Sequence, residues 1–74
     1  MSSPTEAIRE QLMANNPEFQ RLREEHIRYA QRLDQLSAKN HLSEQEQIEE
    51  ILLKKKKLRV KDEMEMMIRQ AGSV

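Results

Sequence analysis

The sequence contains no cysteine and no tryptophan, a single glycine at Gly72, and only two prolines, Pro4 and Pro17. Without cysteine no disulfide can stabilise the fold, and its absence is compatible with a reducing compartment. Because glycine and proline are almost missing from the interior, a β fold with many turns is disfavoured and long helices are favoured. Aromatic side chains are also scarce, since only Phe19 and Tyr29 carry one.

The chain also lacks an excess of either charge and a long apolar run. Lysine plus arginine and aspartate plus glutamate both number 13, so no global field attracts nucleic acid or acidic membranes. No apolar run approaches the roughly 18 residues of a membrane span. The N-terminal segment MSSPTEAIRE has no apolar core of a signal peptide. We therefore predict a cytoplasmic protein with no membrane association.

Hydrophobic residues make up 36% of the chain and charged residues 35%, a balance typical of amphipathic helices. The length of 74 residues predicts one small domain over 1–74. At this size a single core rarely contributes more than roughly 3–5 kcal/mol. Association with other chains is then the remaining way to bury more surface.

Two helices are predicted in the first half of the chain. A capping box of Ser3 and Glu6 predicts a short helix over about 3–15. Asn16 as N-cap, followed by proline, predicts a second helix over 17–39. Apolar residues then recur at steps of three and four, as in an a/d heptad seam. The seam consists of Phe19, Leu22, His26, Tyr29, Leu33 and Leu36.

A short break and a third helix follow. Asn40 is the predicted left-handed C-cap residue of the second helix, since the break contains no glycine. Ser43 and Glu46 form a second capping box, and a long helix is predicted over 44–71. The short connection predicts that the two long helices are antiparallel neighbours.

The third helix carries two apolar stripes on opposite sides. The first stripe is predicted to face the second helix, with Leu36 meeting Ile48 and Phe19 near Met66; its members are Ile48, Ile51, Leu52, Leu58 and Met66. The second stripe is then left for the N-terminal helix, a second protomer or a foreign partner. The predicted oligomer interface in this second stripe consists of Leu53, Val60, Met64 and Met67, with Ala71 beyond them.

The predicted fold is therefore all-α: a short N-terminal helix followed by an antiparallel coiled-coil helical hairpin that assembles into a homo-oligomeric bundle. A dimer is favoured, since two hairpins would give a four-helix core.

Polar residues interrupt the predicted hairpin seam. The register places His26 close to Leu58, with Lys55 and Asp62 about one turn away on either side. These three could form a small catalytic group, but two thin helices offer little of the pocket that catalysis needs. We favour a register device, in which polar core groups specify the pairing at some cost in stability. We predict no enzyme, no cofactor and no metal site.

A basic block in the third helix gives an alternative function. It could contact nucleic acid through Lys54, Lys56, Lys57, Arg59 and Lys61. However, the lysines alternate around the helix, acidic residues follow at i,i+4 spacing, and no aromatic side chain is available for base stacking. We therefore favour a solvated, internally paired surface.

The segments NPEFQRLREEHIRYAQRL and LKKKKLRVKDEM resemble the YdcH-like family of small bacterial proteins, a domain of unknown function. The resemblance rests on the Asn16–Phe19 opening, on His26, and on the block from Leu53 to Glu63, and it covers roughly 16–68. Val60 and Tyr29 depart from the family pattern but remain apolar. The resemblance implies a helical hairpin and no reaction.

We predict from these observations a non-enzymatic structural or protein-interaction module of a bacterial cytoplasm. It is expected to be a homo-oligomer that presents helical surface to a protein partner. The alternative is a small nucleic-acid-associated protein that uses the basic block 54–61.

Overall fold

The computed structural model describes residues 4–72, and these form three helices and no strand. Helix α1 spans Pro4–Asn15, α2 spans Pro17–Ser37 and α3 spans Glu44–Gly72. The predicted all-α class is thus confirmed. The predicted N-cap of the first helix, Ser3, lies outside the described residues. The molecule measures 48 × 22 × 18 Å, so it is elongated along its two long helices.

Helix α2 begins at the predicted cap. The backbone N–H of Phe19 donates to the Asn16 side-chain oxygen at 3.1 Å, and Pro17 occupies the first turn. At the other end, the Ala38 N–H donates to the carbonyl oxygens of Asp34 and Leu36. The prediction of a left-handed Asn40 is wrong, since no residue other than glycine in 4–72 has a positive φ. The helix ends instead at Ala38, whose backbone has right-handed helical φ and ψ angles. This conformation requires neither glycine nor asparagine.

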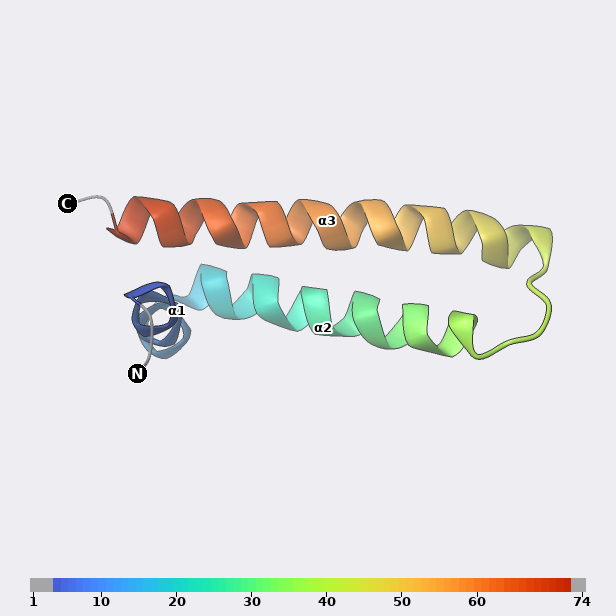
Figure 1. Ribbon diagram of the computed structural model, residues 1–74, viewed down its shortest axis with the longest axis horizontal. Coiled ribbons are helices and arrows are strands. Elements are labelled where there is room, and N and C mark those ends of the chain that lie inside the picture. The colour runs from blue at the N-terminus through green and yellow to red at the C-terminus, as the bar shows by residue number, and fades with distance from the viewer. Residues whose placement is uncertain (1–3, 73–74) are drawn as a thin grey trace.

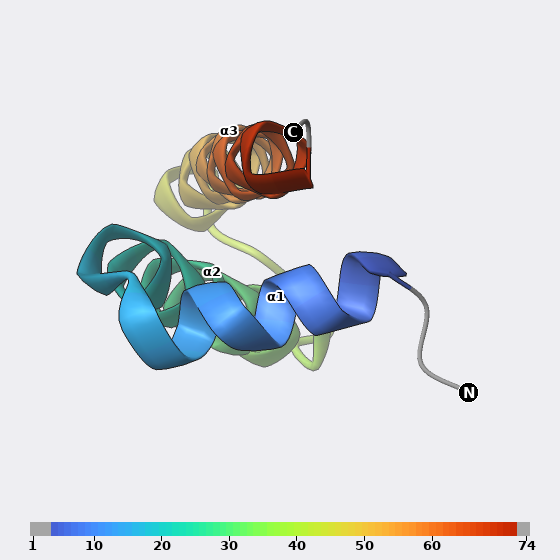
Figure 2. The ribbon, with the colours of Figure 1, turned by 90° about the vertical axis from the view of Figure 1, so that its left-hand side faces the viewer.

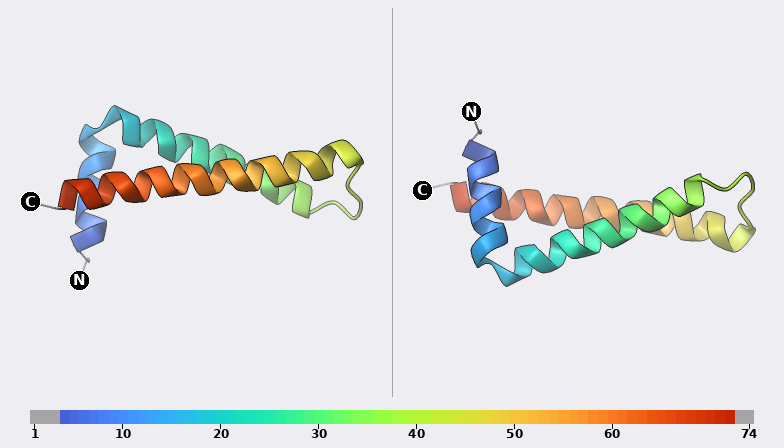
Figure 3. Two further views of the ribbon diagram at one scale, coloured as in Figure 1. Left: turned by 90° about the horizontal axis from the view of Figure 1, so that it is seen from above. Right: turned by 90° about the horizontal axis from the view of Figure 1, so that it is seen from below.

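Helix α3 returns alongside α2, and the segment 38–43 joins them at one end of the molecule (Figure 1). At the opposite end, α1 crosses the pair (Figures 2 and 3). The Gln20 side-chain amide fixes the turn between α1 and α2 by donating to the Met13 carbonyl at 2.6 Å. Ile8 of α1 lies so close to Gly72 that a Cβ there would stand 3.0 Å from its Cδ1. The glycine therefore permits a close approach of α1 to the end of α3.

A thin apolar core lies between the helices. Its buried members are Phe19, Leu22, Leu36, Val60 and Ile68. The six residues of the predicted α2 seam are all buried or partly buried, so the heptad pattern identified the inner face of α2 correctly. The buried residues of α3, Val60 and Ile68, do not belong to the stripe that was predicted to face α2.

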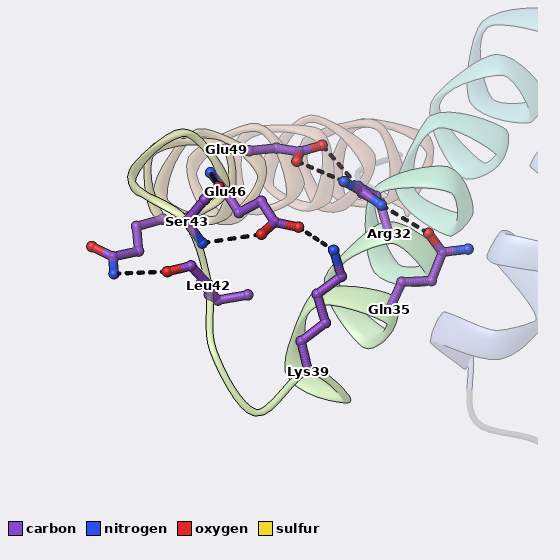
Figure 4. A network of polar contacts seen from close by, with 8 residues as sticks. Arg32, Gln35, Lys39, Leu42, Ser43, Glu46 and Glu49 are labelled. Atoms are coloured by element: carbon purple, nitrogen blue, oxygen red, sulfur yellow. Dashed lines mark hydrogen bonds and ion pairs between the residues drawn. The ribbon is translucent and has the colours of Figure 1, made fainter.

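The loop end of the helix pair is closed by polar contacts (Figure 4). The Arg32 guanidinium donates to both carboxylate oxygens of Glu49, at 2.8 and 2.9 Å, which links α2 to α3. Ser43 and Glu46 form the predicted capping box, with the Glu46 N–H donating to Ser43 Oγ at 3.1 Å and the Ser43 N–H donating to Glu46 Oε1 at 3.0 Å. Lys39 also pairs with Glu46 across the loop. These contacts set which side of α3 meets α2 where α3 begins.

We expect the Glu46 carboxylate to make the stability of the hairpin pH-dependent. The hydrogen bond from Lys39, and then that from the Ser43 N–H, lower the pKa of Glu46 from 4.5 to about 2. A lowered carboxyl pKa stabilises the fold above the unfolded value, and this contribution is lost as the pH falls from about 4.5 to about 2. Glu46→Gln should lower the Tm at neutral pH by several degrees, and the difference from the native protein should disappear near pH ~2.

Thermal unfolding followed by circular dichroism over this pH range checks the prediction. The control is Glu44→Gln in the same helical turn, whose exposed side chain makes no hydrogen bond with the described residues. A Glu46→Gln protein whose deficit is the same at all pH values would show that the carboxylate charge is not responsible.

Candidate functional site

The side of α3 that points away from α2 carries an exposed apolar surface, which we call the outer face. Its large side chains are between 49% and 59% exposed. They are spaced by three, one, six and eight residues, which keeps them on one side of a helix with 3.6 residues per turn. The outer face consists of Ile48, Ile51, Leu52, Leu58 and Met66.

The structure therefore reverses the predicted roles of the two α3 stripes. The predicted oligomer interface lies against the other helices, since Val60 is only 6% exposed and the remaining three residues are partly buried. Those three are Leu53, Met64 and Met67. Conversely, Ile48 and Met66, which were expected to meet α2, are both 59% exposed. Exposed Ala71 is not part of the core.

Desolvation explains the reversal. Lys55, Arg59 and Asp62 lie between the apolar residues of the outer face, and all three are exposed. Turning this face toward α2 would bury their charges, which is costly without partners. The opposite side of α3, which we call the inner face, pairs Glu49 with Arg32. Of its lysines in the middle of the helix, Lys57 is partly buried and Lys61 remains exposed.

The predicted polar group of His26, Lys55 and Asp62 is not assembled. His26 is partly buried on the inner side, whereas Lys55 and Asp62 belong to the exposed outer side of α3. The charges that act on the His26 ring are instead Lys57 and Lys61. The prediction failed because it assumed the other rotation of α3 about its own axis.

A cleft forms where the three helices meet, and we call it the junction cleft. Its volume is about 420 Å³. Four permanent cations and one carboxylate line it, together with His26 and two apolar side chains. The lining residues are Arg9, Arg23, His26, Ile27, Lys57, Lys61, Met64 and Glu65. Burial first, and then the charges of Lys57 and Lys61, lower the pKa of His26 from its usual value of 6.5.

Cations elsewhere on the described helices are often paired. Glu18, Glu46, Glu49, Glu50 and Glu63 each form an ion pair with a lysine or arginine. None of these pairs, which cover the described part of the chain, includes a cation of the junction cleft. The cleft thus concentrates unpaired positive charge in a chain of zero net charge. No local sequence pattern indicates this cleft, because Arg9 and Arg23 come from segments far from the lysine block.

The basic block itself does not form one continuous surface. Lys54 pairs with Glu50 at 3.6 Å and Arg59 pairs with Glu63 at 3.7 Å. Lys57 and Lys61 line the junction cleft instead of facing outward with Lys56. The helix therefore divides these charges among different sides.

Residues 4–72 contain neither a metal-binding group nor a membrane-spanning helix. No group of three or more His, Cys, Asp or Glu side chains is arranged to hold a metal ion there. None of the three helices has the length and apolar character required to cross a membrane.

The fold and these surfaces define a small all-α protein with an exposed apolar face on α3 and a basic cleft at the helix junction. Residues 19–68 match a family described as protein of unknown function (DUF465), and the chain belongs to this family. The YdcH-like proteins that the sequence resembles are part of the same group, which confirms that prediction. Comparisons with curated proteins and with solved structures found no match.

Proposed function

We propose that the protein is a non-enzymatic structural module that self-associates through the outer face of α3. The observation that carries this proposal is the row of five large apolar side chains, each about half exposed, along one side of a single helix. A group of large exposed apolar side chains on one face, with charged residues among them, is typical of an interaction site. We infer that the partner is a second copy of the chain, from the area that one chain exposes and from the order of charges along the outer face.

The first reason is the amount of surface that one chain exposes. One chain exposes 6010 Å², whereas a compact monomer of 8.8 kDa is expected to expose about 4,800 Å². The excess of about 1,200 Å² exceeds the roughly 800 Å² that each partner buries in a standard interface. A single chain of this shape therefore has ample area for a stable dimer.

The second reason is the order of charges and apolar groups along the outer face. Lys55 and Asp62 have their midpoint between residues 58 and 59. Ile51 and Met66 have the same midpoint. A two-fold axis at this point would bring Lys55 of each copy toward Asp62 of the other, and Ile51 toward Met66. Lys55 and Asp62 would then have partners, and Arg59 keeps Glu63 of its own chain as a partner at 3.7 Å. Parallel copies in register would oppose like charges instead, which is unfavourable.

The proposed dimer is accordingly antiparallel along α3 and has two-fold symmetry, the commonest arrangement of soluble oligomers. The antiparallel coiled-coil hairpin of α2 and α3 would be its building unit. Because α2 packs on the opposite side of α3, the two α3 helices would lie at the centre and the two α2 helices outside. This arrangement differs from the sequence-based expectation of hairpins that share one core.

A non-enzymatic role agrees with what the described residues offer. The polar triad that could have supported catalysis is divided between two sides of α3. The junction cleft lies between thin helices and is lined mainly by cations, without a nucleophile and base in contact. The charges of the lysine block lie on different sides of α3. The block therefore forms no single basic surface for a nucleic acid. The outer face is therefore the surface on which we base the proposed function.

Cross-linking of single-cysteine variants tests both the partner and the orientation. The chain has no native cysteine, so each variant carries one thiol. Arg59→Cys would lie next to the two-fold axis and should form a disulfide-linked dimer under mild oxidation. Arg69→Cys, on the same side of α3, is the control, since its copies would be roughly 30 Å apart along antiparallel helices. Both substitutions leave the apolar side chains of the outer face intact.

The cross-linking results distinguish an antiparallel dimer, a parallel dimer and the absence of a dimer. Efficient cross-linking of Arg59→Cys alone supports the antiparallel dimer. Cross-linking of both variants would show a parallel pairing and overturn the proposed orientation. If neither variant cross-links, the outer face does not meet a second copy, and the proposal fails.

A further inference from the structure

The junction cleft is not used by the proposed dimer, because its residues lie on the inner side of α3 and on the two other helices. Arg9 comes from α1, Arg23 and His26 come from α2, and Lys57 and Lys61 come from α3. The fold alone brings these side chains together, since α1 crosses the end of the helix pair (Figure 2).

The charge balance of the cleft favours an anion. Its four permanent cations face one carboxylate, that of Glu65, so it retains a net charge of about +3 when His26 is neutral. Like charges held together destabilise a compact state unless counter-charges neutralise them. Glu65 is the one carboxylate among the residues that line the cleft, and no cation of the cleft takes part in the ion pairs of the described helices.

The side-chain chemistry further indicates phosphate. Two guanidinium groups can each hold a phosphate through two parallel hydrogen bonds, and two ammonium groups add compact charges. Ile27 and Met64 give the cleft an apolar part beside its charged part. The volume of about 420 Å³ lies within the range of pockets for small molecules.

We propose that the junction cleft binds a small phosphorylated molecule, with Arg9, Arg23 and Lys61 contacting its phosphate groups. Lys57 lines the cleft, is partly buried and contributes a further positive charge. Ile27 and Met64 contact the less polar part of the ligand. Because α1 supplies Arg9, binding would also tie α1 to the two long helices.

His26 gives a spectroscopic signal for occupancy. Its surroundings are Arg9 on α1, Arg23 on α2, and Lys57, Lys61 and Glu65 on α3. Burial and the two lysines lower its pKa in the free protein. A bound anion favours the charged imidazolium, so the pKa of His26 should rise when the cleft is filled. His41, in the loop at the other end of the molecule, provides a second ring whose resonances pyrophosphate should not shift.

Titration with inorganic pyrophosphate, followed by NMR and calorimetry at neutral pH and moderate salt, tests the proposal. We expect saturable binding and an upward shift of the His26 titration. Arg9→Ala combined with Lys61→Ala should weaken binding at least about tenfold, since each lost charge-assisted contact is a strong one. Lys56→Ala, an exposed cation outside the cleft, should change the affinity less than about twofold.

Three results would overturn the proposal. The first is no saturable binding of pyrophosphate by the native protein. The second is an equal loss in the cleft double variant and in Lys56→Ala, which would indicate non-specific attraction. The third is tight binding of a single-stranded oligonucleotide without binding of pyrophosphate, which would assign the cleft to a nucleic acid backbone. Circular dichroism of the double variant should match the native protein, because Arg9 and Lys61 are exposed.

Discussion

Phe19→Ala is expected to lower the free energy of unfolding by about 3–5 kcal/mol. Phe19 has no exposed surface and is one of the two largest fully buried side chains. Truncation of a buried phenylalanine typically costs about 3–5 kcal/mol, through lost burial and through the cavity that remains. A single core in a chain of this size supplies a similar total of roughly 3–5 kcal/mol. The substitution therefore removes an amount comparable to the whole stability of one chain.

Thermal and urea unfolding followed by circular dichroism measure this effect. Ile27→Ala is the control, because Ile27 is 40% exposed and its truncation should change the free energy of unfolding by about 1 kcal/mol or less. Nearly equal losses in the two variants would contradict the burial of Phe19 at the start of α2.

Ile51→Glu combined with Leu58→Glu is expected to convert the dimer into a folded monomer. Both side chains are more than half exposed in one chain, so the substitutions do not disturb the packing of α2 against α3. In the dimer they would place four carboxylates in an apolar interface, and burying unpaired charge is costly. We expect the dissociation constant to rise by at least about a hundredfold, with the helix content of the monomer retained. Sedimentation velocity combined with circular dichroism measures both quantities.

Two comparison variants separate this effect from others. Gln11→Glu combined with Gln31→Glu adds the same charge at exposed positions of α1 and α2, and should leave the mass unchanged. Leu53→Glu combined with Val60→Glu places the charges on the inner face of α3, where Val60 is buried, and should unfold the protein. If the inner-face variant stayed folded and became monomeric, the predicted interface of the sequence analysis would be right after all.

Local signals in the sequence predicted the helices well. Asn16 and Pro17 fix the start of α2 through one side-chain hydrogen bond and a preset φ angle, and the capping box at Ser43 fixes the start of α3. The heptad seam of α2 identified its inner face because that helix has only one apolar stripe. Such signals depend on neighbouring residues, so they can be read without the tertiary structure.

The rotation of α3 about its axis was predicted wrongly, because both of its sides are apolar. Periodicity cannot choose between two stripes of similar size. The cost of burying Lys55, Arg59 and Asp62 was the available physical signal, since the inner face carries fewer charges in the middle of the helix. These charged residues interrupt the apolar stripe, but we interpreted His26, Lys55 and Asp62 as a polar register group. Ile68, a buried residue of α3, was assigned to neither stripe.

The junction cleft could not be predicted from the sequence alone. Arg9 and Lys61 are separated by most of the chain, and the crossing of α1 over the helix pair brings them to one place (Figure 3). Nothing in the local pattern of α1 specifies that crossing. The close approach of Ile8 to Gly72 explains it only once the structure is known.

The absolute mass of the native protein in solution, measured by light scattering across a concentration series, tests the central claim of self-association most directly. We expect a stable mass of twice 8.8 kDa down to low micromolar concentrations. A folded protein that keeps a mass of 8.8 kDa at all concentrations would contradict the proposed dimer. The outer face of α3 would then belong to a different partner.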